Sequence, residues 1–299
     1  MSRYLERAIA VSRLADVTLH LSLDARDRAD DDVDPFAPED PNSPIACIRH
    51  ARFAAREVRE SISSEMWERL NTLYLSVVAP GSRARAEENP YTWLKHVREE
   101  AQAVQGLADS TLVHTEEWHF FCLGMYLERA ANVARVLTLE SHLLTFDDGP
   151  AREDETVRCL AVLRSCGSAE AYSRYYSLRV EPARVVEFVL LNPLFPQSIR
   201  YSLNGAWLAL RSIALAGSID ETNPALRALG RLQASVEHTA IDEILERGLA
   251  SFLSGLQRST WEVADQITRI YLSDLSVEQH AMPVARAAMI MAAQQQQQQ

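Results

Sequence analysis

The sequence contains a single lysine, Lys95, and only ten glycines and twelve prolines among 299 residues. So few glycines disfavour β-sandwiches, barrels and glycine-rich nucleotide-binding folds, and one lysine outside any glycine-rich loop excludes a P-loop. The four cysteines show no Cys-x-x-Cys spacing, which indicates buried thiols and not a disulfide framework. The sequence predicts no cofactor and no metal site.

Long hydrophobic runs are also missing. The most apolar stretch, 185–191, has seven residues and includes Glu187, whereas a bilayer-spanning helix needs about 20. Residues 1–7 carry charges where a signal peptide would need an apolar run. The net charge of −11 disfavours sequence-independent nucleic-acid binding, which requires a basic face. We therefore expect a cytoplasmic protein that binds neither nucleic acid nor a membrane.

Apolar residues recur with helical periodicity through most of the chain, and no segment alternates as a strand would. Helices are predicted at 2–23, 43–62, 64–78, 89–107, 109–144 with a break near Thr115, 155–165, 168–178 and 181–191. A turn bracketed by Asn192-Pro193 and Pro196 precedes a helix that ends near residue 216, and further helices, in several pieces, cover 223–272. We predict an all-α fold, a multi-helix bundle that forms one domain over residues 1–293. The glutamine run at 294–299 has no apolar side chains, so we expect it to be disordered.

One ten-residue segment occurs twice. Residues 4–13, YLERAIAVSR, match residues 126–135, YLERAANVAR, at seven of ten positions. The repeat predicts two related halves, about 1–108 and 109–293, each with one YLERA helix. We expect these halves to pack as a pseudo-symmetric bundle around one continuous core.

The repeated segments resemble the bacterial alpha-E family, all-helical proteins named for a Glu-Arg motif. The resemblance rests on 124–130, GMYLERA, and on three further segments at 52–60, 63–68 and 192–198. It implies an operon that encodes partner proteins: an ATP-grasp amidoligase-like protein and often a transglutaminase-like protease. Such a context implies peptide or amide-bond metabolism. Members of the family usually begin earlier, so by this resemblance the start of the chain is truncated.

The repeat places charged residues at equivalent positions of two helices. Glu128, Asn132 and Arg135 share one face of the second helix, and Glu6 and Arg13 occupy the matching face of the first. Seven residues separate Glu128 from Arg135, too many for an easy pair within one helix. We expect the two helices to pack antiparallel, with Glu6 near Arg135 and Glu128 near Arg13.

Two hypotheses account for these charges. In the first, reciprocal buried salt bridges hold the helices together, because the planar guanidinium binds a carboxylate through two hydrogen bonds and stays charged when buried. In the second, a polar cavity binds a carboxylate-bearing ligand, such as a peptide end, through Arg7, Arg129 and their neighbours. The candidate residues are Glu6, Arg7, Arg13, Glu128, Arg129, Asn132 and Arg135. Structural ion pairs outnumber ligand sites of this kind, which favours the first hypothesis.

Two functions follow. The first is a non-enzymatic helical partner or scaffold of the ATP-grasp amidoligase-like system, which the absence of a nucleophile-base pattern favours. The alternative is an enzyme or ligand-binding protein of peptide or amide chemistry, with the Glu-Arg motifs in a shared polar pocket. The geometry decides between them: a sealed contact between the motifs contradicts an enzyme, and a cavity open to solvent favours one.

Three further patterns suggest a function, but each is also explained by ordinary helix or loop surface. Glu116-x-x-His119 has the spacing of di-iron bundles, but those sites need a second such motif, which the sequence lacks. The aspartates of 30–34 alternate as in a calcium loop, but Pro35 lies where that loop needs glycine. Four arginines line one side of the helix predicted at 43–62: Arg49, Arg52, Arg56 and Arg59. This row is either a solvated face or a docking surface for an acidic partner or for the other half of the bundle.

Overall fold

The computed structural model describes residues 1–24, 34–141, 144, 153–176, 180–217 and 223–272. Within these ranges every regular element is helical and no strand occurs, which confirms the all-α prediction. The α-helices are α1 (Ser2–Asp24), α2 (Pro44–Glu57), α3 (Ser64–Val78), α4 (Ser82–Glu88), α5 (Pro90–Thr111), α6 (Glu116–Glu140), α7 (Glu153–Ser165), α8 (Ala169–Tyr176), α9 (Pro182–Leu191), α10 (Ile199–Ala216), α11 (Pro224–Glu237), α12 (Ile241–Arg247) and α13 (Leu249–Ile267). A 3-10 turn, Arg59–Ser61, follows α2, and a π-helical turn, Thr268–Leu272, extends α13. The glutamine tail lies outside the described residues.

Capping side chains fix where several helices begin. Ser43 accepts a hydrogen bond from the backbone N–H of Ala46 (3.2 Å), and Asn89 accepts one from that of Thr92 (3.1 Å). A proline follows each cap at the first helical position, where its missing N–H leaves no donor unsatisfied. The starts of α2 and α5 are therefore set by residues that are local in the sequence.

The break that the sequence predicts near Thr115 is present. α5 ends at Thr111 and α6 begins at Glu116, so the stretch 109–144 is not one helix. The short helix α4 has no counterpart among the predicted helices. It follows Gly81, whose left-handed φ of 75° turns the chain away from α3.

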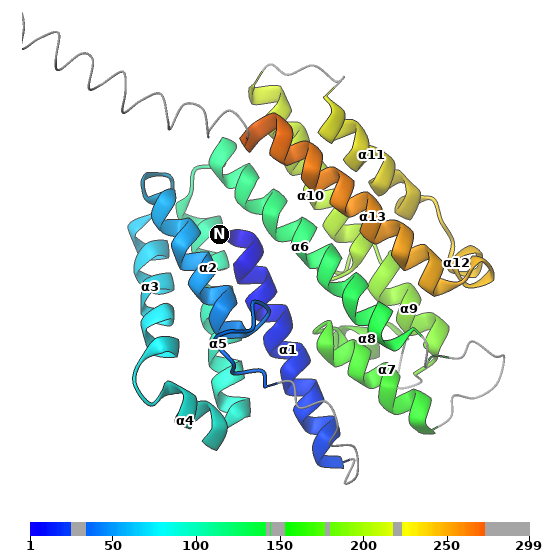
Figure 1. Cartoon of the computed structure of the whole chain (residues 1–299). Coiled ribbons are helices and arrows are strands. Elements are labelled where there is room, and N and C mark those ends of the chain that lie inside the picture. Colours follow the sequence, from blue (N-terminus) through cyan, green and yellow to red (C-terminus); the bar gives the residue numbers. More distant parts are fainter. Residues whose placement is uncertain (25–33, 142–143, 145–152, 177–179, 218–222, 273–299) are drawn as a thin grey trace, which may run out of the picture.

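The helices form two groups, α1–α5 and α6–α13, which lie side by side in Figure 1. Each group encloses its own cluster of buried apolar side chains, with Ile48 and Leu94 in the first and Phe188 and Leu210 in the second. Phe121 of α6 belongs to the first cluster. Charged side chains of α1 and α6 pair where the two groups meet. The single continuous core that we expected stays a prediction. The limits of the predicted domain and its halves stay a prediction.

α1 and α6 form the boundary between the groups. α1 packs against α2 and α5 on one side and against α6 and α7 on the other, while α6 packs most extensively against α10. Both helices run in the same general direction (Figure 1), with Ser2, at the start of α1, beside Gly124 of α6. The antiparallel packing that we expected is wrong. Pseudo-symmetry of the two halves stays a prediction.

None of the described helices is long and apolar enough to cross a membrane.

Candidate functional site

The glutamate and arginine of each YLERA motif pair with those of the other motif. Arg129 donates two hydrogen bonds to Glu6, from Nε to Oε1 (2.9 Å) and from Nη2 to Oε2 (3.0 Å). Arg7 donates to Glu128 in the same way, from Nε to Oε1 (2.7 Å) and from Nη2 to Oε2 (3.0 Å). We call these four residues the Glu-Arg cluster. Each pair has the bidentate geometry in which guanidinium binds carboxylate most strongly.

The partners differ from those expected. Because α1 and α6 run in the same direction, equivalent positions of the repeat face each other, so the expected pairs Glu6–Arg135 and Glu128–Arg13 do not form. Arg135 instead donates to Glu128 of its own helix (2.9 Å). The long side chain spans the two intervening turns because helical side chains lean toward the N-terminus. Arg13 makes no hydrogen bond or ion pair with any residue of the described ranges and lies in a separate cavity.

The buried side of the cluster connects α1 and α6 to two further parts of the chain. Gln105 of α5 donates to Oε2 of Glu6 (2.8 Å), and Arg129 Nη1 donates to the backbone oxygen of Pro196 in the turn before α10 (3.2 Å). Asn132 donates to the backbone oxygen of Glu6 (3.5 Å). The carboxyl group of Glu6 thus belongs to a network that joins α1, α5, α6 and this turn.

The other side of the cluster reaches the surface. Glu128 is only 2% exposed, but two of its arginine partners are far more so: 57% of the Arg3 side chain and 48% of the Arg135 side chain are exposed. Arg3 Nε donates to Glu128 Oε2 at 3.3 Å, and Arg135 also donates to the side-chain oxygen of Asn132. Arginines therefore form part of the layer between this buried carboxylate and water.

The titration of Glu128 reflects two opposed influences. Burial by itself raises the pKa of this carboxyl group, because it disfavours the charged form. Hydrogen bonds and charge from Arg7, and the charge of Arg135, outweigh burial and hold the pKa below its ordinary value. Glu128 is therefore ionised at neutral pH.

We expect Glu128→Gln to destabilise the protein at neutral pH by about 1.5–3 kcal/mol, the contribution of hydrogen bonds to charged groups. The folded pKa lies below the unfolded one, so the ionised side chain contributes fully above about pH 4.3. That contribution is lost as the pH falls through the folded pKa. Urea unfolding of both proteins across this range should show the difference shrinking in acid. A difference that is constant with pH would contradict an ionic role.

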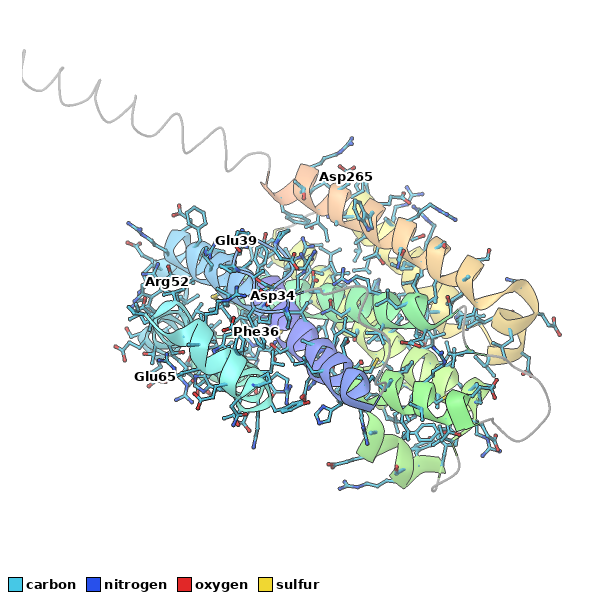
Figure 2. All side chains as sticks on the ribbon, turned by 60° about the horizontal axis from the view of Figure 1, so that its bottom comes forward. Asp34, Phe36, Glu39, Arg52, Glu65 and Asp265 are labelled. Atoms are coloured by element: carbon cyan, nitrogen blue, oxygen red, sulfur yellow. The ribbon has the colours of Figure 1, made fainter. Side chains whose placement is uncertain are left out.

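The row of four arginines on α2 divides into two parts. Arg52, labelled in Figure 2, donates to the side chain of Asn71 on α3 (2.8 Å) and lies over the ring of Trp67 (5.4 Å to its centre), so it connects α2 to α3. Arg49 and Arg56 are exposed. The row is thus partly internal, and its two exposed members leave the docking alternative open.

The weaker metal patterns find no support in the described ranges, where no group of three or more His, Cys, Asp or Glu side chains is placed to hold an ion. Residues 30–33 of the acidic segment lie outside these ranges, and Asp34 binds Arg83 (2.5 Å). All four cysteines are buried free thiols, and burial raises the pKa of each, such as that of Cys47, to about 12.

Comparison with known proteins identifies the family. A model described as a predicted alpha-helical domain with a conserved ER motif, Alpha-E, matches residues 35–272. This range contains Glu128 and Arg129, and the Glu6-Arg7 pair precedes it.

Similar proteins include uncharacterized proteins of Mycobacterium bovis and Mycobacterium tuberculosis, each 26% identical over 247 residues. The similar segment covers 79% of this chain but only 27% of each relative, so the chain spans about a quarter of their length. No solved structure matches. Since the family model matches most of the sequence, and one of the Glu-Arg pairs lies inside the matched range, the chain belongs to the Alpha-E family.

Proposed function

We propose that this protein is a non-enzymatic helical partner or scaffold of an ATP-grasp amidoligase-like system in peptide or amide-bond metabolism, acting in the cytoplasm. The hydrogen bonding of the two motif carboxylates is the observation that supports the proposal. Both oxygens of Glu6 and both oxygens of Glu128 accept at least one hydrogen bond from an arginine of the protein itself. A general base or nucleophile needs a free lone pair that faces its substrate, whereas each of these four oxygens already binds at least one arginine of the protein. The motifs are thus better suited to holding helices together than to catalysis.

The mycobacterial relatives add a second line of support. In each, the segment similar to this chain makes up 27% of a longer protein. A domain that is fused to further sequence in its relatives is one that we expect to act together with other domains or proteins. A partner role for this chain agrees with that arrangement.

The alternative is an enzyme or ligand-binding protein of peptide or amide chemistry that uses the Glu-Arg motifs in a shared pocket. One observation favours it: Arg3 and Arg135 are about half exposed, so one side of the cluster meets solvent. Against it, neither Glu6 nor Glu128 lines the large cavity that lies farther along α1.

A reconstitution experiment separates the two functions. The purified chain is combined with the amidoligase-like protein that the family resemblance implies as its partner, together with peptide substrates and ATP, and amide formation and ADP release are followed. We expect the chain alone to form and cleave no amide bond, to co-elute with the amidoligase-like protein, and to change its rate. Turnover by the chain alone would establish the enzyme alternative. If neither a complex nor a change in rate is found, the partner proposal is wrong.

The same assay tests the exposed part of the arginine row. Replacing Arg49 and Arg56 together with serine removes two exposed charges from α2. The matched control replaces Arg231 and Arg247, exposed arginines of α11 and α12, in the same way. Loss of the complex in the first variant alone would identify α2 as the docking surface. Equal binding by both variants would leave the row as a solvated face.

A further inference from the structure

Arg13 forms no hydrogen bond or ion pair with the other candidate residues, although the charges of Glu6 and Arg129 act on it. Its guanidinium lies against Gly167, so closely that a Cβ added to that glycine would lie 2.8 Å from Arg13 Cζ and 3.1 Å from Nε. Gly167 also has a left-handed φ of 62°, so two independent constraints favour glycine there. Arg13 is partly buried and makes no hydrogen bond or ion pair within the described ranges. A charge removed from water without a partner is costly, which makes this side chain unusual.

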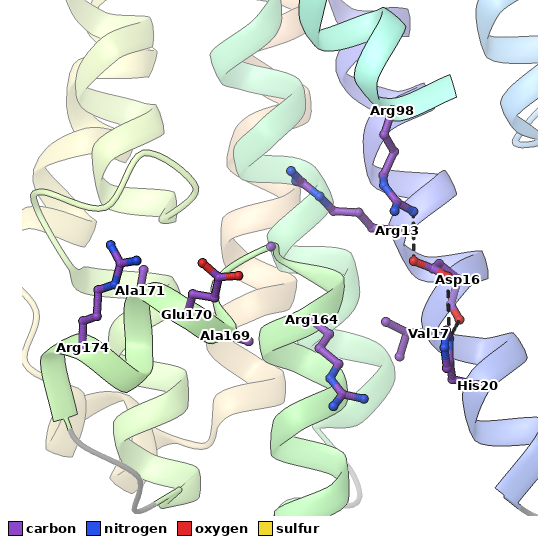
Figure 3. Close-up of a pocket in the computed structure, with 11 residues that line it drawn as sticks. Arg13, Asp16, Val17, His20, Arg98, Arg164, Ala169, Glu170, Ala171 and Arg174 are labelled. Atoms are coloured by element: carbon purple, nitrogen blue, oxygen red, sulfur yellow. Dashed lines mark hydrogen bonds and ion pairs between the residues drawn. The ribbon is translucent and has the colours of Figure 1, made fainter. Parts of the chain in front are cut away.

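The guanidinium of Arg13 faces a cavity of about 760 Å³ between α1, α5, α7 and α8 (Figure 3). Three more arginines line it: Arg98 of α5, Arg164 of α7 and Arg174 of α8. We call it the arginine pocket. Its volume lies in the range of about 300–1,000 Å³ that is typical of sites for small organic molecules, and is larger than a lone inorganic ion requires.

Positive charge exceeds negative charge in the arginine pocket, although the whole protein is acidic. Of its two carboxylates, Asp16 is engaged with Arg98 (3.0 Å) and Glu170 lies on α8 (Figure 3). Burial lowers the pKa of Arg13, the charge of Glu6 opposes this, and the nearby charge of Arg98 lowers it further. A negatively charged group between the guanidinium groups would offset both the burial and the repulsion.

The backbone adds a second source of positive potential. α7 ends in a turn where the N–H of Gly167 donates to Arg164 O (2.9 Å) and the N–H of Ser168 donates to Leu163 O (2.7 Å). This turn brings the first turn of α8, residues 169–171, to the wall of the pocket. N–H groups in the first turn of a helix have no partner within the helix, and the helix dipole is positive there, so this end favours an oxyanion.

We propose that the arginine pocket binds a small molecule that bears a carboxylate or phosphate group. The Arg13 guanidinium holds the oxyanion, with the first turn of α8 beside it, and Val17 of α1 and Ala171 of α8 provide apolar surface for the rest of the ligand. The proposal does not rest on the partnership with an amidoligase, because it concerns binding by the chain alone.

Calorimetric titration with two probes, inorganic phosphate and citrate, tests the proposal at ionic strength held constant with chloride. We expect the wild-type chain to bind at least one probe and Arg13→Met to bind it at least about tenfold more weakly, since hydrogen bonds to a charged group are lost. Arg231→Met is the matched control, because it removes the same charge from a side chain of α11 that is 63% exposed. Its affinity should equal that of the wild type. The preferred probe then tells a phosphate site from a carboxylate site.

Thermal unfolding provides the second readout and guards against a misfolded variant. Arg13→Met removes an unpartnered charge from a partly buried position, so its melting temperature without anion should not fall below that of the wild type. The bound probe should raise the melting temperature of the wild type and of Arg231→Met, but not that of Arg13→Met. An equal response of all three proteins, or no response to either probe, would overturn the proposal.

Discussion

Replacing Arg129 with methionine is expected to lower the free energy of unfolding by about 3–5 kcal/mol, the cost of removing one partner from a buried ion pair. Glu6 is only 2% exposed and would lose both hydrogen bonds from Arg129, keeping one from Gln105. Its carboxyl group would then lie in the interior with no countercharge in contact. Methionine fills much of the same volume as arginine. The lost free energy of unfolding therefore reflects the missing charge more than a cavity. Urea denaturation of both proteins measures the difference.

Arg3→Met is the matched control, because Arg3 also donates to a motif glutamate, Glu128, but is largely exposed. Exposed ion pairs contribute about 0–1 kcal/mol, so this variant should lie within that range of the wild type. Replacing Glu6 and Arg129 together with methionine should restore much of the lost stability, because no buried charge is left unpaired. If Arg129→Met costs no more than Arg3→Met, the Glu-Arg cluster does not hold α1 against α6.

Local sequence patterns predicted most of the helices because their causes are local. Ser43 and Asn89 each precede a proline, and each caps a helix that begins at that proline. The repeat likewise predicted that the two YLERA helices would meet through their charges. The direction of the contact was not predictable in the same way, since a repeat shows which faces are equivalent but not whether the two helix axes run parallel or antiparallel. That direction alone decides whether Glu6 meets Arg129 or Arg135.

The remaining members of the site depend on tertiary structure. Gln105 has no motif that marks it, and Pro196 contributes a backbone oxygen, which no side-chain pattern reveals. Arg3 could have been recognised, because it precedes Arg7 by one helical turn on the same face. The arginine pocket arises only when α7 and α8 fold against α1 and bring Gly167 to Arg13, which are far apart in the sequence.

The contact between α6 and α10 leads to the second large effect. Gly205 of α10 lies against the ring of Tyr126, where an added Cβ would be 2.6 Å from Cε2 and 2.8 Å from Cδ2 and Cζ. We therefore expect Gly205→Ala to destabilise the protein by about 1–3 kcal/mol, the usual cost of overpacking. Such a contact cannot be relieved unless the ring or one of the helices moves. Differential scanning calorimetry measures the change.

Gly106→Ala in α5 is the control, since it is the same substitution inside a helix but has no atom within 4 Å of the added Cβ. Alanine favours a helix over glycine by about 1 kcal/mol, so this variant should be more stable than the wild type. If Gly205→Ala lowers stability and Gly106→Ala raises it, the effect at Gly205 is due to packing and not to helix propensity. A change of stability in the same direction in both variants would contradict the packing explanation.

Tyr126 also lies under the guanidinium of Arg129 (5.5 Å to the ring centre), so displacing it should disturb the Glu-Arg cluster. The effects of Gly205→Ala and Arg129→Met should therefore not add, and a double-mutant cycle would measure how strongly the α6–α10 contact supports the pairing of the motifs.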